Sequence, residues 1–265
     1  MANLWRFPVK SMAGEELEEA EISKVGIAGD RAYALIDGET GDVVSASSAR
    51  LFPGLLNFRA SFVKPPSPGR ELPPIRIKMP DGREVTTECG EVDRALSAHF
   101  RREVTLARAD RTVPQWAGLE FFDESGIAPP GVPGGFFDLY PVSVMTTATL
   151  ARLAESRPSS RFDLRRFRMN VIVSSDEAGF PENDWVGLSI ALGGEARLRV
   201  SVPDPRCVMA TLAQDDLPHD PGILRAVVRD NSLEIGKAGL LPCAGVYAII
   251  ETPGTVRIGD PVAIH

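Results

Sequence analysis

The segment Leu188–Val202 reads LSIALGGEARLRVSV, and it decides the fold class of the chain. Apolar and polar residues alternate on both sides of Gly193-Gly194, which is the pattern of two half-buried strands. Adjacent glycines readily adopt the left-handed backbone conformations that a tight hairpin turn needs. The segment therefore predicts an antiparallel hairpin with strands at Leu188–Leu192 and Ala196–Val202.

The same alternation recurs along the chain, and helical spacing is rare. Only residues 92–102, 147–157 and 221–230 place apolar side chains on one face of a helix. The other expected strands lie at residues 4–9, 32–37, 56–63, 75–79 and 104–107, and then at 142–146, 169–173, 245–251, 255–258 and 261–264.

These elements predict a mainly β protein with a few helices, of the α+β class. Many short strands with close turns are typical of one or two barrels or sandwiches. The run Pro129–Gly135, PPGVPGG, is incompatible with regular structure. We therefore expect residues 110–135 to form a boundary loop or an active-site loop.

Composition excludes several classes of function. The chain has 265 residues and a net charge of −7, which disfavours binding to nucleic acid or to anionic membranes through positive charge. No apolar run approaches the roughly 20 residues that span a bilayer. The N-terminal residues lack the apolar stretch of a secretory signal, so a cytoplasmic protein is expected.

The three cysteines, Cys89, Cys207 and Cys243, are scattered and form no Cys-x-x-Cys pair, which argues against a disulfide framework or a zinc ribbon. Cys207 follows Arg206 in the run PDPRCV, and a neighbouring cation favours the ionised sulfur. The sequence leaves three roles open for Cys207: a nucleophile, a soft metal ligand or an inert buried thiol.

Polar residues interrupt the apolar strands at three further places. Lys10-Ser11 follows the first strand, Arg31 lies in a Gly-Asp-Arg run, and Arg168 and Asn170 precede an apolar strand. In an extended segment Arg168 and Asn170 share one face, whereas Arg165 or Arg166 would be solvated or salt-bridged. Arginine suits phosphate and carboxylate, so these positions indicate an anionic ligand.

Five short motifs occur in order along nearly the whole chain, and together they resemble the MOSC family, relatives of the C-terminal domain of molybdenum cofactor sulfurase. The motifs are FPVKS (7–11), GDR (29–31), RFRMN (166–170), PRCV (205–208) and PGTVRIGDPV (253–262). The resemblance implies a MOSC N-terminal β-barrel domain at residues 1–110, a connecting loop at 111–135 and a MOSC domain at 136–265. The last would be a closed barrel resembling the pyruvate kinase β-barrel.

The resemblance also implies a molybdenum cofactor, the complex of molybdenum with molybdopterin. Cys207 matches the family's molybdenum ligand and is the expected catalytic position. The positions that match the family's cofactor-binding residues are Lys10, Ser11, Arg31, Thr146, Thr147, Arg168, Asn170 and Arg206.

The implied activity is reduction of N-hydroxylated substrates, such as hydroxylaminopurines or amidoximes, with electrons from a separate donor protein. An alternative is a non-catalytic carrier of the cofactor, or of sulfur held on Cys207 as a persulfide. A third reading is a barrel that has lost its ligand. Ala213 stands where relatives carry an aspartate, so Asp215 or Asp216 would have to replace that acid.

Overall fold

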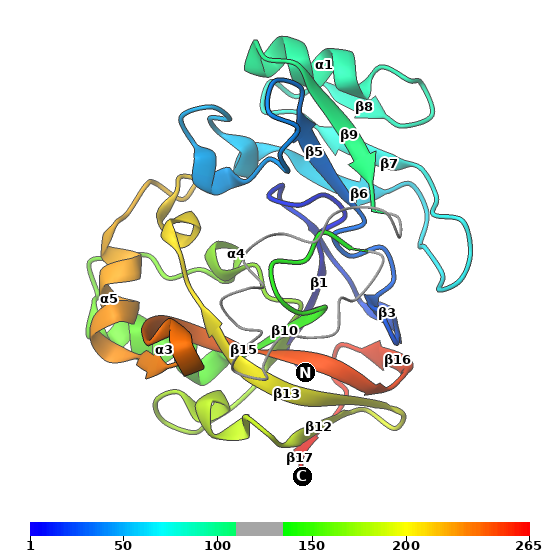
Figure 1. The fold of residues 1–265 in the computed structure, drawn as a ribbon. Coiled ribbons are helices and arrows are strands. Elements are labelled where there is room, and N and C mark those ends of the chain that lie inside the picture. Colours follow the sequence, from blue (N-terminus) through cyan, green and yellow to red (C-terminus); the bar gives the residue numbers. More distant parts are fainter. Residues whose placement is uncertain (110–134) are drawn as a thin grey trace.

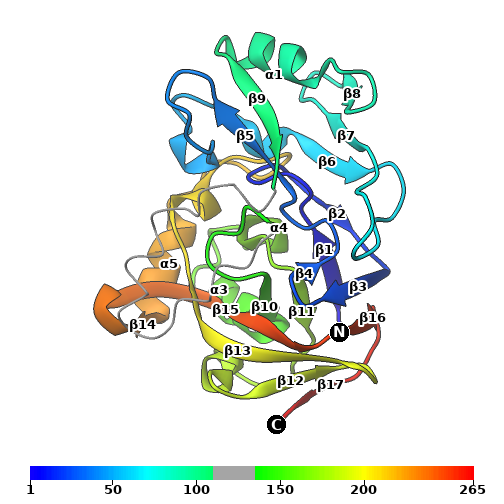
Figure 2. The same ribbon diagram turned by 45° about the vertical axis from the view of Figure 1, so that its right-hand side comes forward.

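The structure is a computed structural model that describes residues 1–109 and 135–265. Almost all of the expected connecting loop, 111–135, lies outside these residues. Figures 1 and 2 show a small β-rich part around α1 above a larger part built on one long sheet, and both chain ends lie in the larger part.

The long sheet has nine strands and combines both ends of the chain. Its order is β17-β12-β13-β15-β10-β11-β1-β2, with β14 paired to β15. Only the β10–β11 pair is parallel, because α3 crosses over between these two strands. The strands are β1 (Asn3–Arg6), β2 (Glu15–Glu16), β10 (Val142–Thr146), β11 (Val171–Val173), β12 (Ser189–Leu192), β13 (Ala196–Pro205), β14 (Ser232–Glu234), β15 (Leu240–Thr252) and β17 (Val262–Ile264).

The expected hairpin at Leu188–Val202 is confirmed. Strands β12 and β13 pair antiparallel from Ser189↔Arg199 to Leu192↔Ala196. Gly193 takes a φ of 63°, the left-handed conformation that the turn requires. Strand β13 then continues to Pro205, beyond the expected end at Val202, and so carries the chain towards Cys207.

The expected closed barrel is not seen in the ladders of residues 1–109 and 135–265. The main sheet runs from edge strand β17 to edge strand β2 without joining them. After β15 the chain turns at Pro253, and β16 (Gly254–Arg257) pairs with β3 (Glu19–Ser23), which also pairs with β4 (Gly26–Ile27). This three-stranded sheet covers one face of the main sheet. The described residues form a mainly β structure with a few helices, as expected.

Each face of the main sheet packs against a separate apolar core. Val142 and Val144 of β10 face the core beneath β3, β4 and β16. Met145 of the same strand faces a second core, which α3 and α5 cover. Since successive side chains of a strand point to opposite faces, burial on both faces explains the continuous apolar runs in these strands.

A third core lies within the upper part of Figure 1. Strands β5 (Tyr33–Asp37) and β9 (Val104–Arg108) form one sheet. Strands β6 (Arg59–Phe62), β7 (Ile75–Lys78) and β8 (Glu84–Thr86) form another, beside α1 (Val92–Phe100). Strand β1 pairs with β11 and β3 pairs with β16, so strands from the first residues lie beside strands from the second half of the chain. The division into domains at residues 110 and 136 stays a prediction.

Helices α1, α3 (Thr147–Ser156) and α5 (Gly222–Asp230) occur where the sequence predicted them. The prediction of an extended segment at residues 165–170 was wrong, because Leu164–Phe167 forms the short helix α4. Asp163 caps this helix through its contact with the Arg165 amide, and Arg168 ends it with a φ of 54°. None of the helices in the described ranges has the length and apolar character to cross a membrane.

Candidate functional site

One cavity collects most of the residues that the sequence predicted for the site. Its predicted lining residues are Lys10, Ser11, Arg31, Arg168, Arg206 and Cys207. Its other lining residues are Asp138, Ser143, Arg166, Phe167, Asp204, Pro205, Met209, Ala210 and Tyr247. We refer to this space as the Cys207 cavity. Strands β10, β13 and β15 and the loop after β1 contribute to it, so residues far apart in the sequence share one surface.

Cys207 is exposed and stands just beyond the end of β13. The pairing of β13 with β15 continues to the rung Pro205↔Cys243, which holds the approach to the cysteine in place. The Arg166 guanidinium secures the turn that follows, because it donates to the Ala210 carbonyl at 3.2 Å. The sequence predicted that Arg165 or Arg166 would be solvated or salt-bridged; Arg165 is, because it pairs with Asp163 at 2.7 Å, whereas Arg166 is 1% exposed and serves the site.

Arg206 and Asp204 form a buried ion pair beside Cys207. Arg206 Nη1 lies 2.5 Å from Asp204 Oδ2, and the side chains are 12% and 2% exposed. Burial, partly offset by Arg206, raises the pKa of Asp204 to about 6. Burial alone would lower the pKa of Arg206, but the charge of Asp204, followed by Tyr247 and Cys207, raises it above its usual value.

Two atoms of this pair lack hydrogen bonds. Asp204 Oδ1 and Arg206 Nε are buried and have no partner among the described residues. A buried polar atom without a partner costs free energy, on the order of 1–3 kcal/mol. Such atoms at the wall of a cavity indicate a surface that is completed by a bound group.

Arg31 connects the segment after β4 to the segment that holds Arg168 and Asn170. Its Nη1 donates to Asp30 Oδ2 at 2.5 Å and to Asn170 Oδ1 at 3.1 Å, and its Nη2 donates to the Arg168 carbonyl at 3.1 Å. Asn170 is 1% exposed, and its Oδ1 also accepts from the Ser143 amide and hydroxyl at 3.1 Å. Asn170 thus supports the site from beneath Arg31 and is absent from the residues that line the cavity.

The ring of Phe7 stacks against two guanidinium groups. Arg31 and Arg168 lie 4.7 Å and 4.4 Å from its centroid. Burial and the nearby charge of Arg31 lower the pKa of Arg168 to about 9. Arg168 Nη1 donates to the Met12 carbonyl, a neutral partner. The site therefore holds buried positive charge that an anion would compensate.

Backbone strain concentrates around the cavity. Ser11, Arg31 and Arg168 have φ values of 64°, 47° and 54°. They are three of the five non-glycine residues with positive φ in the described part of the chain. A non-glycine residue held at positive φ costs about 1–3 kcal/mol of folding free energy, and such residues cluster at functional sites. Their shared position strengthens the assignment of the cavity as the functional site.

Lys10 and Ser11 follow the first strand, as expected, and both are buried. Lys10 Nζ contacts the Phe136 carbonyl at 3.2 Å and forms an ion pair with Asp138. Partial desolvation works against ionisation of Asp138, but the charge of Lys10 holds the pKa of this carboxyl below its usual range. Ser11 Oγ accepts from the Ala46 amide at 3.1 Å, so it also ties the site to the upper part of the molecule.

Thr146 and Thr147, the remaining predicted site residues, are not among the residues that line this cavity. Thr146 is fully buried and caps α3 by accepting from the Thr149 amide. Its hydroxyl donates to Glu182 at 2.7 Å, and Thr147 contacts Ser175. Ser143, near the start of β10, lines the cavity. Thr146 ends this strand and Thr147 begins α3, so both threonines lie farther along the chain, where β10 meets the helix.

Asp215 and Asp216, considered as replacements for the acid missing at Ala213, also lie outside the Cys207 cavity. Asp216 is paired with Arg161 and Arg165, whose hydrogen bonds lower its pKa to about 2. Such a carboxyl stays ionised at neutral pH and is a poor proton donor.

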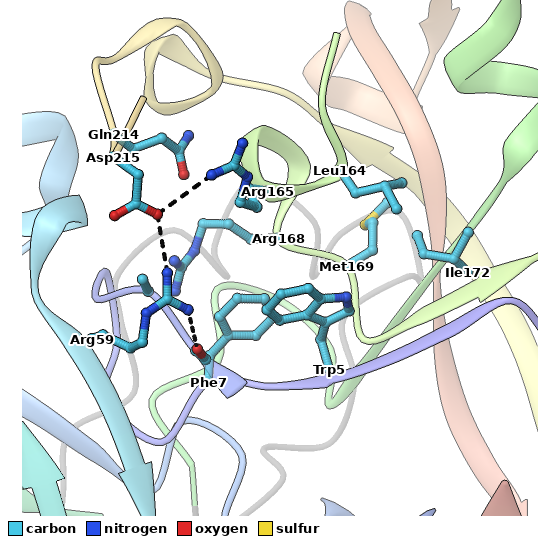
Figure 3. Close-up of a pocket in the computed structure, with 12 residues that line it drawn as sticks. Trp5, Phe7, Arg59, Leu164, Arg165, Arg168, Met169, Ile172, Gln214 and Asp215 are labelled. Carbon is cyan, nitrogen blue, oxygen red and sulfur yellow. Dashed lines mark hydrogen bonds and ion pairs between the residues drawn. The ribbon is translucent and has the colours of Figure 1, made fainter. Parts of the chain in front are cut away.

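A second cavity lies on the other side of Arg168 (Figure 3). The stacked rings of Trp5 and Phe7, 6.2 Å between centroids, form its floor. Asp215 closes one side by pairing with Arg59 at 3.0 Å and lying 3.6 Å from Arg165. Arg168 is the residue that lines both cavities.

Sequence reasoning missed Asp138, Asp204 and Tyr247. Asp204 was visible as a lone carboxyl between two prolines near Cys207, a position where a buried charge needs an explanation. Tyr247 lies in an apolar run of β15 and Asp138 follows Phe136-Phe137, so neither has a local signal that sets it apart. Only the pairing of distant strands shows that they share the cavity.

Comparison with known proteins gives two family matches. The MOSC N-terminal beta barrel domain matches residues 1–117, and the MOSC domain matches residues 135–263. Curated relatives include mitochondrial amidoxime-reducing component 1 of Mus musculus, 26% identical, and component 2 of Rattus norvegicus, 23% identical. Each alignment covers 99% of this chain, and 81% and 82% of the mouse and rat proteins.

Among solved structures, the YUAD protein from Bacillus subtilis matches with a TM-score of 0.45 and 16% identity. That match covers 99% of this chain and 93% of the other chain. The two domain matches together span most of the sequence and contain every motif on which the resemblance rested. This chain therefore belongs to the MOSC family.

Proposed function

We propose that this protein binds the molybdenum cofactor in the Cys207 cavity and reduces N-hydroxylated compounds. The observation that carries the proposal is the placement of an exposed thiol beside buried cations from three distant segments. A thiolate is a soft ligand that suits molybdenum, and guanidinium and ammonium groups suit the phosphate of a pterin cofactor. The relatives named for amidoxime reduction supply the reaction class.

The residues present fit such a group in charge and in hydrogen bonding. Five cationic side chains line the cavity, against the carboxylates of Asp138 and Asp204; they are Lys10, Arg31, Arg166, Arg168 and Arg206. The buried Arg206 Nε still has a hydrogen bond to donate among the described residues. An anionic ligand would use that donor and would offset the burial of Arg168.

Each residue has a separate task in this proposal. Cys207 holds the metal through its sulfur, and Arg31 and Arg168 hold anionic oxygens of the cofactor. Asn170 orients Arg31 through the 3.1 Å hydrogen bond, and Ser11 fixes the loop that carries Lys10. The bound cofactor supplies the two-electron redox chemistry, while the protein binds and orients both it and the substrate.

The reaction needs partners beyond the cofactor. Reduction of an N–OH group consumes two electrons and two protons, so we infer a separate electron-donor protein. We also infer action in the cytoplasm on small molecules such as hydroxylaminopurines or amidoximes. The net charge of −7 supports a small-molecule substrate rather than nucleic acid. The three unpaired cysteines support a reducing compartment such as the cytoplasm.

The test is purification of the protein from cells that make the cofactor. We expect bound molybdenum and pterin in equal amounts, together with reduction of an N-hydroxylated base or a benzamidoxime by an artificial electron donor. Cys207→Ser should lose molybdenum and turnover. Cys89→Ser, a change at another exposed cysteine outside the cavity, is the matched control and should retain both.

The outcomes separate the proposal from its rival. Stoichiometric molybdenum without turnover on a broad substrate panel would indicate a cofactor carrier. A persulfide on Cys207 without molybdenum would indicate a sulfur carrier. Absence of molybdenum, pterin and persulfide would refute every role that the cavity has been assigned here.

A further inference from the structure

We propose that Asp204 is the proton donor of the Cys207 cavity, in place of the acid that Ala213 cannot provide. This inference rests on the proposed reductase function. Its basis is geometric: Asp204 lines the same cavity as Cys207, is 2% exposed, and keeps one carboxyl oxygen without a hydrogen bond among the described residues.

The reaction gives this carboxyl a defined task. For a hydroxylamine, R–NHOH takes up two electrons and two protons and yields R–NH2 and H2O. The N–O bond breaks and the oxygen leaves as water, with an electron pair that the donor protein would supply and the cofactor, when bound, would make available. Asp204 delivers one of the two protons to the leaving oxygen, and solvent at the exposed side of the cavity supplies the second and reprotonates Asp204.

The position of Asp204 suits proton donation. Its Oδ2 is held by Arg206 at 2.5 Å, which leaves Oδ1 as the free oxygen. Burial keeps the acid protonated to higher pH than an exposed carboxyl, since its pKa is raised to about 6. An acid is most effective when its pKa lies near the working pH.

The groups around Asp204 work in opposite directions. Arg206, on the same segment, and a hydrogen bond from Tyr247 favour the ionised form of Asp204, whereas the charge of Asp138, which lines the same cavity, favours the protonated form. Tyr247 and Cys243 on β15 stay neutral, because burial and then the charge of Asp204 raise the pKa of each, that of Cys243 to about 12.

The alternative carboxyls do not fit this task. Asp138 is about half exposed at its side chain and is paired with Lys10, which lowers its pKa. Asp215 and Asp216 do not line the cavity. Among the described residues that line the Cys207 cavity, Asp204 is therefore the carboxyl that is both buried and open to a new hydrogen bond.

The experiment compares Asp204→Asn, Asp204→Glu and the control Asp216→Asn with the wild type, all as cofactor-loaded protein. In the wild type, kcat should fall as pH rises through the pKa of the acid. Asp204→Asn should keep its molybdenum content but lose about 100-fold or more in kcat and lose that pH dependence. Asp204→Glu should restore part of kcat with a shifted profile, and Asp216→Asn should retain the wild-type profile.

A second readout avoids turnover. In the cofactor-free protein, the infrared difference between wild type and Asp204→Asn should contain the C=O band of a protonated carboxylic acid, which disappears near pH 6. Asp216→Asn should retain this band. Because the measurement needs only folded protein, failure of Asp204→Asn to bind the cofactor would not remove the test; if that variant does not fold, the band is followed in Asp204→Glu, where it should shift.

The outcomes are distinct from those of the proposed function. An active wild type whose pH profile and kcat survive in Asp204→Asn would overturn the role of Asp204 and leave the reductase proposal standing. A molybdenum-loaded wild type without turnover would overturn the reductase proposal and this inference with it. Absence of the carboxylic acid band at every pH above 4 would also overturn the inference.

Discussion

Arg31 and Asn170 share a 3.1 Å hydrogen bond although 139 residues separate them in the sequence. Arg31 follows β4, and Asn170 precedes β11 in the main sheet. The bond therefore joins the segment between β4 and β5 to the residue that precedes β11 of the main sheet. It explains why the functional residues depend on packing of the whole chain.

Replacing Asn170 with alanine should destabilise the protein by about 2–4 kcal/mol, because it leaves buried donors on Ser143 and Arg31 without an acceptor. Chemical denaturation measures this loss. Ser143→Ala removes one of these partners and should cost less. Equal effects from the two substitutions would contradict the central role given to Asn170.

Inorganic phosphate should stabilise the cofactor-free protein by compensating the charge of Arg168. Burial and the charge of Arg31 lower the pKa of Arg168 and so disfavour its charged form. The hydrogen-bond partner of Arg168 Nη1, the Met12 carbonyl, is neutral and compensates this charge poorly. We expect the rise in Tm with phosphate to be much smaller in Arg168→Met. Without phosphate, the unfolding free energies of the wild type and Arg168→Met should differ by less than about 2 kcal/mol, since removal of an uncompensated buried charge is often neutral.

The Arg206–Asp204 pair should show strong coupling in a double-mutant cycle. Arg206→Met alone should cost about 3–5 kcal/mol, because it leaves Asp204 buried without its cation. Arg206→Met combined with Asp204→Leu should cost clearly less than the sum of the single changes. Additive effects in urea denaturation would show that the two side chains do not interact as the structure describes.

Asp204 should also affect how stability depends on pH. Its folded pKa is raised to about 6 from 3.8, so the native state binds more protons than the unfolded state between these values. Asp204 therefore contributes stability that is full below pH 4 and is lost as pH rises through 6, on the order of 3 kcal/mol. The wild-type minus Asp204→Asn difference in unfolding free energy should decrease over this range and stay constant above it.

Thr146→Ala should reduce stability without reducing cofactor content. The substitution removes the cap of α3, worth about 0.5–2 kcal/mol, and a hydrogen bond to the buried Glu182. Molybdenum analysis of the purified variant should give the wild-type ratio. A selective loss of molybdenum in a variant of normal stability would show that Thr146 contacts the cofactor after all.

Much of the local structure followed from the sequence. The alternation around Gly193-Gly194 predicted the β12–β13 hairpin, because a period of two residues and two flexible glycines suit few other structures. Helices α3 and α5 followed from apolar spacing over whole turns. The four-residue helix α4 did not, since one turn is too short for a periodic signal and the Asp163 cap that starts it resembles any loop aspartate.

The sequence by itself determined the fold class, the family and the importance of Cys207, Arg31 and Arg168, because these depend on local pattern and on motif order. The tertiary structure alone decided which side chains share a cavity. It brought Asp138 and Tyr247 to the cavity of Cys207 and placed Thr146 and Asp216 elsewhere. The physical reason is that strand register and the two-sided packing of the main sheet set these distances, and both depend on contacts between residues far apart in the chain.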